Sequence, residues 1–160
     1  MARVKDPGEK SPSSIQAEVQ AAVALCRQRG GHVTPLREAV LTALLSARGP
    51  IGAYDLKERV SDAVGRPISP ASIYRALDFL IAQGVAARIE SRNAFVASEH
   101  PGHDHTCILF VCDACGSSSE IENETLERLL AADARELGFS IDHRVIELSG
   151  ACAECRTPAK

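Results

Sequence analysis

Two Cys-x-x-Cys pairs are the residues of this chain best suited to chemistry. Cys112 and Cys115 form the first pair, and Cys152 and Cys155 form the second. A two-residue gap lets both sulfurs of a tight turn face one ion, and zinc takes four thiolates at tetrahedral angles. The spacing therefore predicts a closed, structural four-cysteine zinc site.

The same pairs also allow two disulfides or two redox motifs. The redox compartment separates these alternatives, and the sequence shows no export signal: residues 1–14 are polar and contain Pro7 and Pro12. There is also no run of about twenty apolar residues to span a membrane. We therefore expect a cytoplasmic protein in reducing surroundings, where thiols bind metal.

Histidines gather just before the first cysteine pair. His100, His103 and His105 are three of the five histidines in the chain. Imidazole is a common zinc ligand, so this segment is a candidate for a second metal site. The alternative is a solvated polar linker, because the segment 98–106 also contains Pro101 and Gly102.

The segment 15–97 has the pattern of a winged helix-turn-helix that follows a flexible leader, 1–14. Helical spacing of apolar residues predicts four helices, which start near Ser13 or Ser14, at Thr34-Pro35, near Ala53 and at Ser69-Pro70. After Gly84 the apolar residues alternate, which predicts a hairpin that turns at 91–93. The last helix buries one face and exposes Ser72, Arg75 and Phe79, with Tyr74 and Asp78 at the margin. In the hairpin, Arg88 and Arg92 lie where a wing could touch phosphates.

The charge is divided unevenly along the chain. Up to Phe95 there are 13 Lys and Arg against 9 Asp and Glu, whereas the remainder has 5 against 12. The first half can therefore approach a polyanion such as DNA, and the second half should not.

The segment 107–160 predicts a small α/β unit. We expect strands at 107–112 and 117–121, a helix from about Asn123, and a final strand over 139–145 that leads to the second cysteine pair. The helix should turn four leucines toward a core, namely Leu126, Leu129, Leu130 and Leu137. So few elements are marginal alone, and an open sheet edge invites a second copy, so we expect a two-fold homodimer. The whole chain is then an α+β protein, in which 98–106 is a hinge.

Several of these motifs together resemble the ferric uptake regulator family, and within it the zinc uptake regulator branch. They are Thr34-Pro35-Leu36-Arg37, Ala53-Tyr54-Asp55-Leu56, Ser72 to Leu80, the His-Asp-His run, both cysteine pairs and Val145-Ile146-Glu147. The resemblance implies a homodimeric, metal-dependent transcriptional repressor that binds double-stranded operator DNA. It also implies a C-terminal dimerisation domain and about two Zn²⁺ per subunit, one structural and one regulatory.

The resemblance assigns roles to single residues. Cys112, Cys115, Cys152 and Cys155 match the structural zinc ligands, and Tyr54 and Arg75 match DNA-contacting positions. Ser72 and Tyr74, beside Arg75, complete the expected DNA-binding set. An arginine fork can bind the O6 and N7 atoms of guanine, although an ion pair with Asp78 is the alternative role for Arg75.

The regulatory zinc site departs from the family pattern. His105 and Glu120 match sensing ligands, but the other two matched positions hold Ala87 and Ser98, which are not usual zinc ligands. We expect His100 and His103 to replace them. Three further residues could take their place, namely Asp104, Cys107 and His143.

Other classes of function fit less well. A zinc-dependent deaminase needs Pro before its Cys-x-x-Cys, but Val111 and Ala151 stand there, and no phosphate-binding or nucleophile motif is present. A thiol oxidoreductase would place its pair in a βαβ context. We therefore expect no enzyme. Within the family, a sensor of iron, manganese or peroxide remains the alternative, because His and carboxylate ligands suit those metals too.

Overall fold

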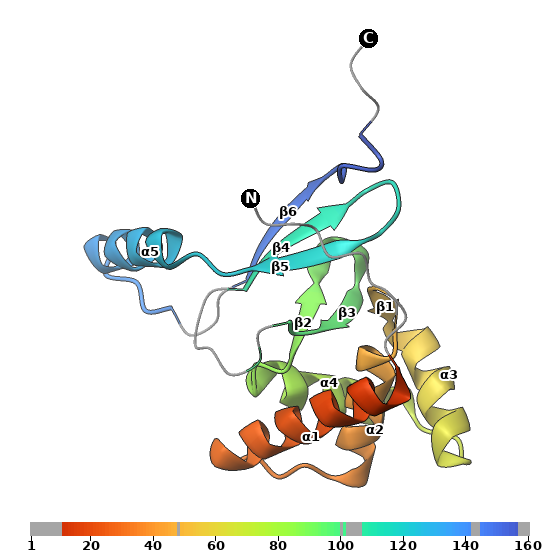
Figure 1. Cartoon of the computed structure of the whole chain (residues 1–160). Helices are drawn as coiled ribbons and strands as arrows, with labels where there is room; N and C mark the ends of the chain where they lie inside the picture. Colours follow the sequence, from red (N-terminus) through yellow and green to blue (C-terminus); the bar gives the residue numbers. More distant parts are fainter. Residues whose placement is uncertain (1–10, 48, 100, 102–106, 142–144, 157–160) are drawn as a thin grey trace. The chain divides into compact units, whose positions relative to one another are not determined.

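The chain folds into two compact units, residues 1–103 and 104–160. The computed structural model describes residues 11–47, 49–99, 101, 107–141 and 145–156 (Figure 1). In the described residues the first unit has four α-helices and a three-stranded sheet, and the second has a three-stranded sheet and one helix. The expected α+β class is confirmed. No described helix has the length and apolar character that a membrane span requires.

Proline-led caps define three of the four helices of the first unit. The helices are α1 (Pro12–Gln28), α2 (Pro35–Leu45), α3 (Ala53–Val64) and α4 (Pro70–Ala82). Before α1, α2 and α4, the hydroxyl of Ser11, Thr34 or Ser69 accepts a hydrogen bond from the backbone N–H three residues later. Helix α1 therefore starts earlier than predicted, because Pro12 already occupies its first turn.

The apolar faces of these helices form one core. Its members come from all four helices and from the adjoining strands, and the largest fully buried side chains among them are Val19, Val40, Leu41, Leu56, Val60, Ile73, Leu77, Leu80 and Val85. The predicted inward face of α4 is confirmed at Ile73, Ala76, Leu77 and Leu80. On the other side of this helix Tyr74, Arg75 and Asp78 are exposed. The prediction that Phe79 is exposed is wrong, because its ring packs against the core with the Arg37 guanidinium 3.6 Å from the ring centre.

The predicted hairpin is present and gains a third strand. Strands β2 (Ala86–Ile89) and β3 (Ala94–Ala97) pair antiparallel, and the short strand β1 (Ile51–Gly52) pairs with the other edge of β3. A 3₁₀ turn, η1 (Glu90–Arg92), joins β2 to β3 and ends at Asn93, whose φ of 47° is left-handed. Two residues give no readable alternation, so β1 could not be predicted from the sequence.

The second unit has the sheet order β5-β4-β6. Strand β4 (Cys107–Cys112) pairs antiparallel with β5 (Ser118–Ile121) and parallel with β6 (Val145–Gly150), while helix α5 (Glu124–Glu136) lies between β5 and β6 in sequence. The prediction that the last strand begins at Phe139 is wrong. The Phe139 N–H instead donates to the Ala134 carbonyl at 2.8 Å and closes the end of α5, where Gly138 has a φ of 66°.

The apolar face of α5 is not covered within its own unit. No residue of this helix is buried, and Leu129 and Leu137 are 57% and 82% exposed. The expectation that its leucines face a core is therefore wrong for the single chain. The reason is that the described part of this unit offers no second layer for them.

The turn after α1 requires glycine for two different reasons. Gly30 has a φ of 76°, and the Gly31 N–H donates to the Cys26 carbonyl at 2.7 Å, as in a Schellman motif. A Cβ at Gly31 would lie 2.8 Å from Oε1 of Gln83 and 3.0 Å from the Cys26 carbonyl oxygen. The Gln83 Oε1 atom is buried, so α1 and α4 approach closely here.

We predict that Gly31→Ala lowers the free energy of unfolding of the first unit by about 1–3 kcal/mol, the usual cost of overpacking. Urea denaturation followed by circular dichroism measures this change. In a Gln83→Ala background the cost of Gly31→Ala should fall, because the nearest atom of the clash has gone. An equal cost in both backgrounds would contradict the packing explanation.

Candidate metal centre and DNA-binding surface

The parallel pairing of β4 with β6 brings the two cysteine pairs together. In this register Cys112 lies opposite Gly150, so both strands end at the same edge of the sheet. The N–H of Asp113 donates to the Gly150 carbonyl at 2.7 Å and ties the following turns together. The pairs are therefore neighbours although about forty residues separate them.

Both pairs sit on similar turns. The N–H of Gly116 donates to the Cys112 carbonyl at 2.9 Å, and the N–H of Arg156 donates to the Cys152 carbonyl at 2.8 Å. Each turn thus returns the second cysteine of its pair toward the first. Gly116 has a φ of 78°, a conformation that glycine adopts without strain.

The four sulfurs fit a tetrahedral metal site. They lie within 4.8 Å of one another, and Sγ of Cys115 lies 3.8 Å from Sγ of Cys152. A regular tetrahedron with Zn–S bonds of about 2.3 Å has an edge of about 3.8 Å. The described cysteines are free thiols, and 3.8 Å is far from a disulfide bond length of about 2.05 Å. The cluster is therefore suited to bind zinc.

Hydrogen bonds change the pKa values of the thiols in this cluster. Backbone N–H groups of Cys115 and Cys152 lower the pKa of the Cys112 thiol to about 6, and the N–H of Cys152 lies 3.3 Å from its sulfur. Hydrogen bonding to Ser117 lowers the pKa of Cys115. Hydrogen bonding of its thiol to the other sulfurs, first to that of Cys152, raises the pKa of Cys155 to about 12. Four thiolates together therefore require a positive charge among them.

The predicted regulatory ligands are mostly outside the described residues. His100, His103 and His105 lie there, as do Asp104 and His143. Glu120 is described, half-buried on β5 opposite Leu109, and Cys107 begins β4. The hinge site therefore stays a prediction.

Two of the predicted DNA-contacting side chains are well exposed. Tyr54, in the first turn of α3, is 72% exposed, and the Lys57 ammonium lies 5.6 Å from its ring centre. Arg75 is exposed on α4, and no ion pair with Asp78 forms. The Arg75 guanidinium is thus available to a ligand.

The other two predicted contacts are more constrained. Ser72 lies in the first turn of α4, where its hydroxyl is 2.9 Å from that of the cap residue Ser69. Tyr74 is 40% exposed, and its ring packs edge-on against Phe95, with ring centres 6.4 Å apart. No sequence pattern indicates this ring contact, because Tyr74 and Phe95 belong to different elements, α4 and β3.

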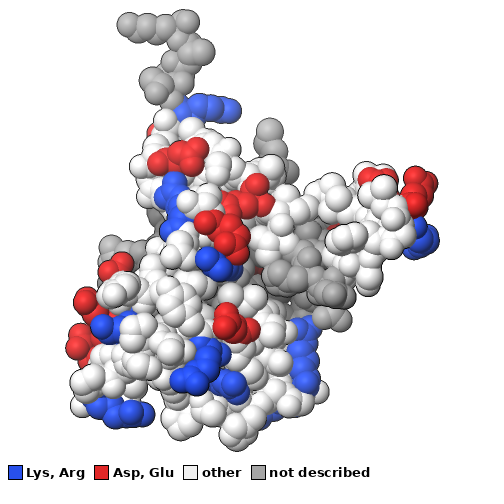
Figure 2. Space-filling model, turned by 180° about the vertical axis from the view of Figure 1, so that it is seen from behind, with Lys and Arg blue, Asp and Glu red and all other residues white. Residues whose placement is uncertain are grey.

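The basic side chains do not form one continuous surface on the face of the molecule that Figure 2 shows. Figure 2 shows Lys and Arg in separate clusters over the helical unit, with Asp and Glu between them. DNA binding would therefore depend on a few placed cations rather than on overall charge.

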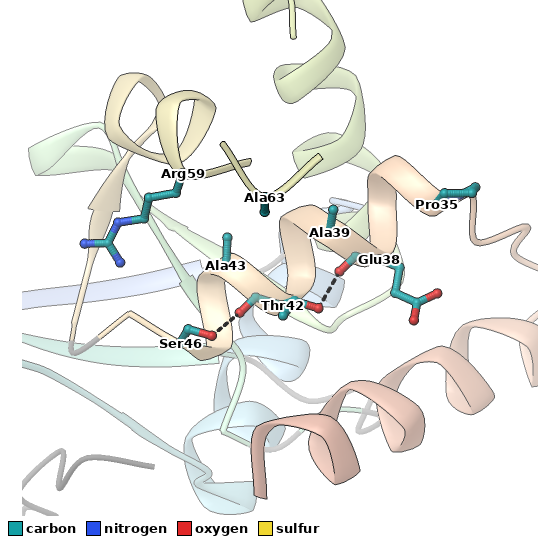
Figure 3. Close-up of a pocket in the computed structure, with 8 residues that line it drawn as sticks. All are labelled: Pro35, Glu38, Ala39, Thr42, Ala43, Ser46, Arg59 and Ala63. Atoms are coloured by element: carbon teal, nitrogen blue, oxygen red, sulfur yellow. Dashed lines mark hydrogen bonds between the residues drawn. The ribbon is translucent and has the colours of Figure 1, made fainter. Parts of the chain in front are cut away.

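A groove of ≈ 580 Å³ lies between α2 and α3 (Figure 3). Its lining includes the short side chains of Ala39, Ala43 and Ala63. The Thr42 hydroxyl donates to the Glu38 carbonyl at 2.8 Å, and the Ser46 hydroxyl donates to the Thr42 carbonyl at 2.7 Å. These hydroxyls are committed to the helix backbone. The groove is thus separate from the cysteine cluster and offers no free hydroxyl for chemistry.

Comparison with known proteins shows which family has this sequence and architecture. The model of the ferric uptake regulator family matches residues 28–149. The zinc uptake regulation protein of Escherichia coli is 36% identical over 146 residues, which are 89% of this chain and 84% of that protein.

Solved structures agree with this similarity. A zinc uptake regulator complexed with zinc and DNA is 36% identical, covers 91% of this chain and 96% of its own, and has a TM-score of 0.81. Holo XcZur is 38% identical, covers 87% and 96%, and has a TM-score of 0.76. The chain belongs to the ferric uptake regulator family.

Proposed function

We propose that this protein is a zinc-responsive, DNA-binding transcriptional repressor that controls genes for zinc uptake and homeostasis. The observation that carries the proposal is the likeness, over nine-tenths of the chain, to a zinc uptake regulator complexed with zinc and DNA. The exposed α4 face and the cysteine cluster supply the two chemistries that this function needs. Such a regulator acts where the DNA is, so we place it in the cytoplasm.

Helix α4 is the element that we assign to the major groove. Its 13 residues span about 20 Å, enough to lie across a groove about 12 Å wide. The unpaired Arg75 guanidinium can bind one guanine through two hydrogen bonds, and Tyr54 can add a hydroxyl or a ring edge. Ser72 and Tyr74, on the same helix as Arg75, complete the proposed contact surface.

The four cysteines are the proposed structural zinc ligands. When bound, this zinc supplies a rigid cross-link between the ends of β4 and β6. Cys112, the buried member, anchors the site to the sheet, and Cys115 is exposed at its rim. The cluster thereby fixes the turn on which each pair sits.

The second proposed zinc site is regulatory and uses the hinge. We assign it His100, His103, His105 and Glu120, the last of which would be contributed by β5. A ligand set drawn from the segment 98–106 and from β5 would tie this segment to the second unit and so restrict how the two units move. Effector binding would thus favour the arrangement in which two DNA-binding units of a dimer fit half-sites about 34 Å apart or a multiple of this.

A second copy of the chain is the proposed cover for the apolar surface of the second unit. Its exposed large apolar side chains are Phe110, Leu129, Leu137, Phe139 and Leu148. A homodimer would bury them and would also present two reading helices to a two-fold operator. The acidic balance of this half of the chain keeps it away from phosphates.

Zinc should control DNA binding through the hinge histidines. We expect zinc-loaded protein to shift a duplex that it enriches from a random library, and we expect a chelator to reverse the shift. His103→Ala or His105→Ala should remove the zinc response without unfolding the protein. Gel shift across a zinc titration measures this, and His32→Ala, in the exposed turn before α2, serves as the control that keeps the response. Zinc-dependent binding that survives both hinge substitutions would refute the site.

The cysteine cluster should hold one tightly bound zinc. We expect atomic spectroscopy to find two zinc ions per subunit, one of them resistant to mild chelation. Cys152→Ser should release the resistant ion and unfold the second unit, since a structural zinc contributes about 10–16 kcal/mol in peptide systems. Cys26→Ala, which changes a buried thiol of the first unit, should keep both ions. Retention of the resistant ion by Cys152→Ser would exclude this ligand set.

The apolar face of α5 should hold the dimer together. Leu129→Glu should convert the dimer to a monomer in sedimentation velocity, because it places a charge on a face that is apolar and exposed in the single chain. Arg128→Glu changes the charge of the same helix and should leave the dimer intact. A Leu129→Glu protein that sediments as wild type would show that the interface lies elsewhere.

A further inference from the structure

Two arginines that the sequence places on the recognition helix and on the wing, Arg75 and Arg88, have different surroundings. Among the described residues Arg75 on α4 has no ion-pair partner, whereas Arg88 on β2 is held by its own hairpin. Nη2 of Arg88 donates to Oδ1 of Asn93 at 3.0 Å, and Nε lies 3.3 Å from Oε2 of Glu90. The Arg88 side chain is 43% exposed, yet two of its three nitrogens, Nη2 and Nε, are directed back into the turn.

The backbone of the turn places both partners of Arg88. Glu90 opens the 3₁₀ turn and Asn93 follows it in a left-handed conformation with φ 47° and ψ 43°. Asn is one of the few residues that tolerates this conformation. The side chains of Glu90 and Asn93 can therefore hold one guanidinium from two sides.

The held guanidinium lies over an aromatic ring. Arg88 is the cross-strand partner of Phe95, so both side chains lie on the same face of the sheet. The Arg88 Cζ atom is 5.9 Å from the Phe95 ring centre, within the range of a cation–π contact.

Phe95 in turn contacts α4, the helix that we assign to the major groove. Its ring is 2% exposed and meets the Tyr74 ring at an interplanar angle of 70°, an edge-to-face geometry. Tyr74 precedes Arg75 on α4 and remains partly exposed. A continuous set of contacts thus runs from the wing turn through Phe95 to a side chain of the proposed DNA surface.

We propose that Arg88 is a positioning residue for DNA recognition: clamped by Glu90 and Asn93 over Phe95, it orients Tyr74 rather than contacting phosphate. This proposal rests on the DNA-binding function proposed above. Its physical basis is preorganisation, because a tyrosine already held in its bound orientation loses less freedom on binding. It also reverses the sequence-based expectation that Arg88 reaches the DNA backbone.

The salt dependence of binding separates the two roles. The logarithm of the DNA-binding constant falls linearly with the logarithm of the salt concentration. Loss of one phosphate contact makes this slope shallower by about 0.9, whereas loss of a positioning contact leaves it unchanged. We expect Arg88→Met to weaken binding about 2- to 5-fold, the range that a partly exposed cation–π contact corresponds to, with an unchanged slope. Arg135→Met on α5 makes the same charge change and should leave affinity and slope as in wild type.

Two further variants test the connection to Tyr74. Arg88→Lys keeps the charge but loses the planar fork, so it should behave like Arg88→Met. In a Tyr74→Phe background, Arg88→Met should cost less than in wild type, because the hydroxyl that it orients is gone. All variants are compared on the duplex enriched by zinc-loaded wild-type protein, and thermal denaturation checks that they are folded.

The outcomes are distinct. A shallower salt slope for Arg88→Met, rescue by Arg88→Lys, additive effects with Tyr74→Phe, or unchanged affinity would each overturn the positioning role while leaving the DNA-binding function intact. Failure of the wild-type protein to enrich any duplex would overturn the DNA-binding function itself, and the positioning role with it.

Discussion

The second unit buries very little apolar surface, and much of the molecule follows from this constraint. Of its described residues only Ile108, Leu109, Val111 and Cys112 are buried hydrophobic side chains, and all four lie on β4. The three aliphatic side chains contribute about 1.5–3 kcal/mol each, while ordering the backbone costs about 1–2 kcal/mol per residue. Such a unit needs further stabilisation. The cysteine cluster at the end of β4 and the apolar face of α5 are the two places where a metal ion and a second copy can supply it.

The first unit has the opposite character. Its core takes side chains from four helices and the adjoining strands, so it can be stable alone. Under the function proposed above, the first unit would bind DNA with a core of its own, and the second unit would depend on metal and on a second copy for stability. A regulator built this way can lose or change its assembly without unfolding the part that reads DNA.

The sequence predicted the elements that local chemistry defines. Ser or Thr followed by Pro marked the start of α2 and α4, and Gly65, with a φ of 71°, marked the end of α3. The cysteine spacing predicted a cluster that the register of β4 and β6 then explains. Errors arose where one pattern fits two structures: Phe139 alternates like a strand residue but closes α5, and the leucines of α5 are spaced like core residues but have no partner within the unit.

Residue roles at the binding surface could not be read from residue type. Arg75 and Arg88 carry the same guanidinium, and the sequence treats both as cations beside a polyanion. The structure separates them by their neighbours. No carboxylate in the described part of the chain pairs with Arg75, whereas Glu90 and Asn93 both contact Arg88 from the wing turn, in which Asn93 has a left-handed backbone conformation. Under the positioning role proposed above, tertiary contacts decide which cation meets the DNA and which one orients the side chain that does. The wing would then act on recognition through Phe95 and α4, so that specificity would depend on packing inside the unit as well as on the residues that face the groove.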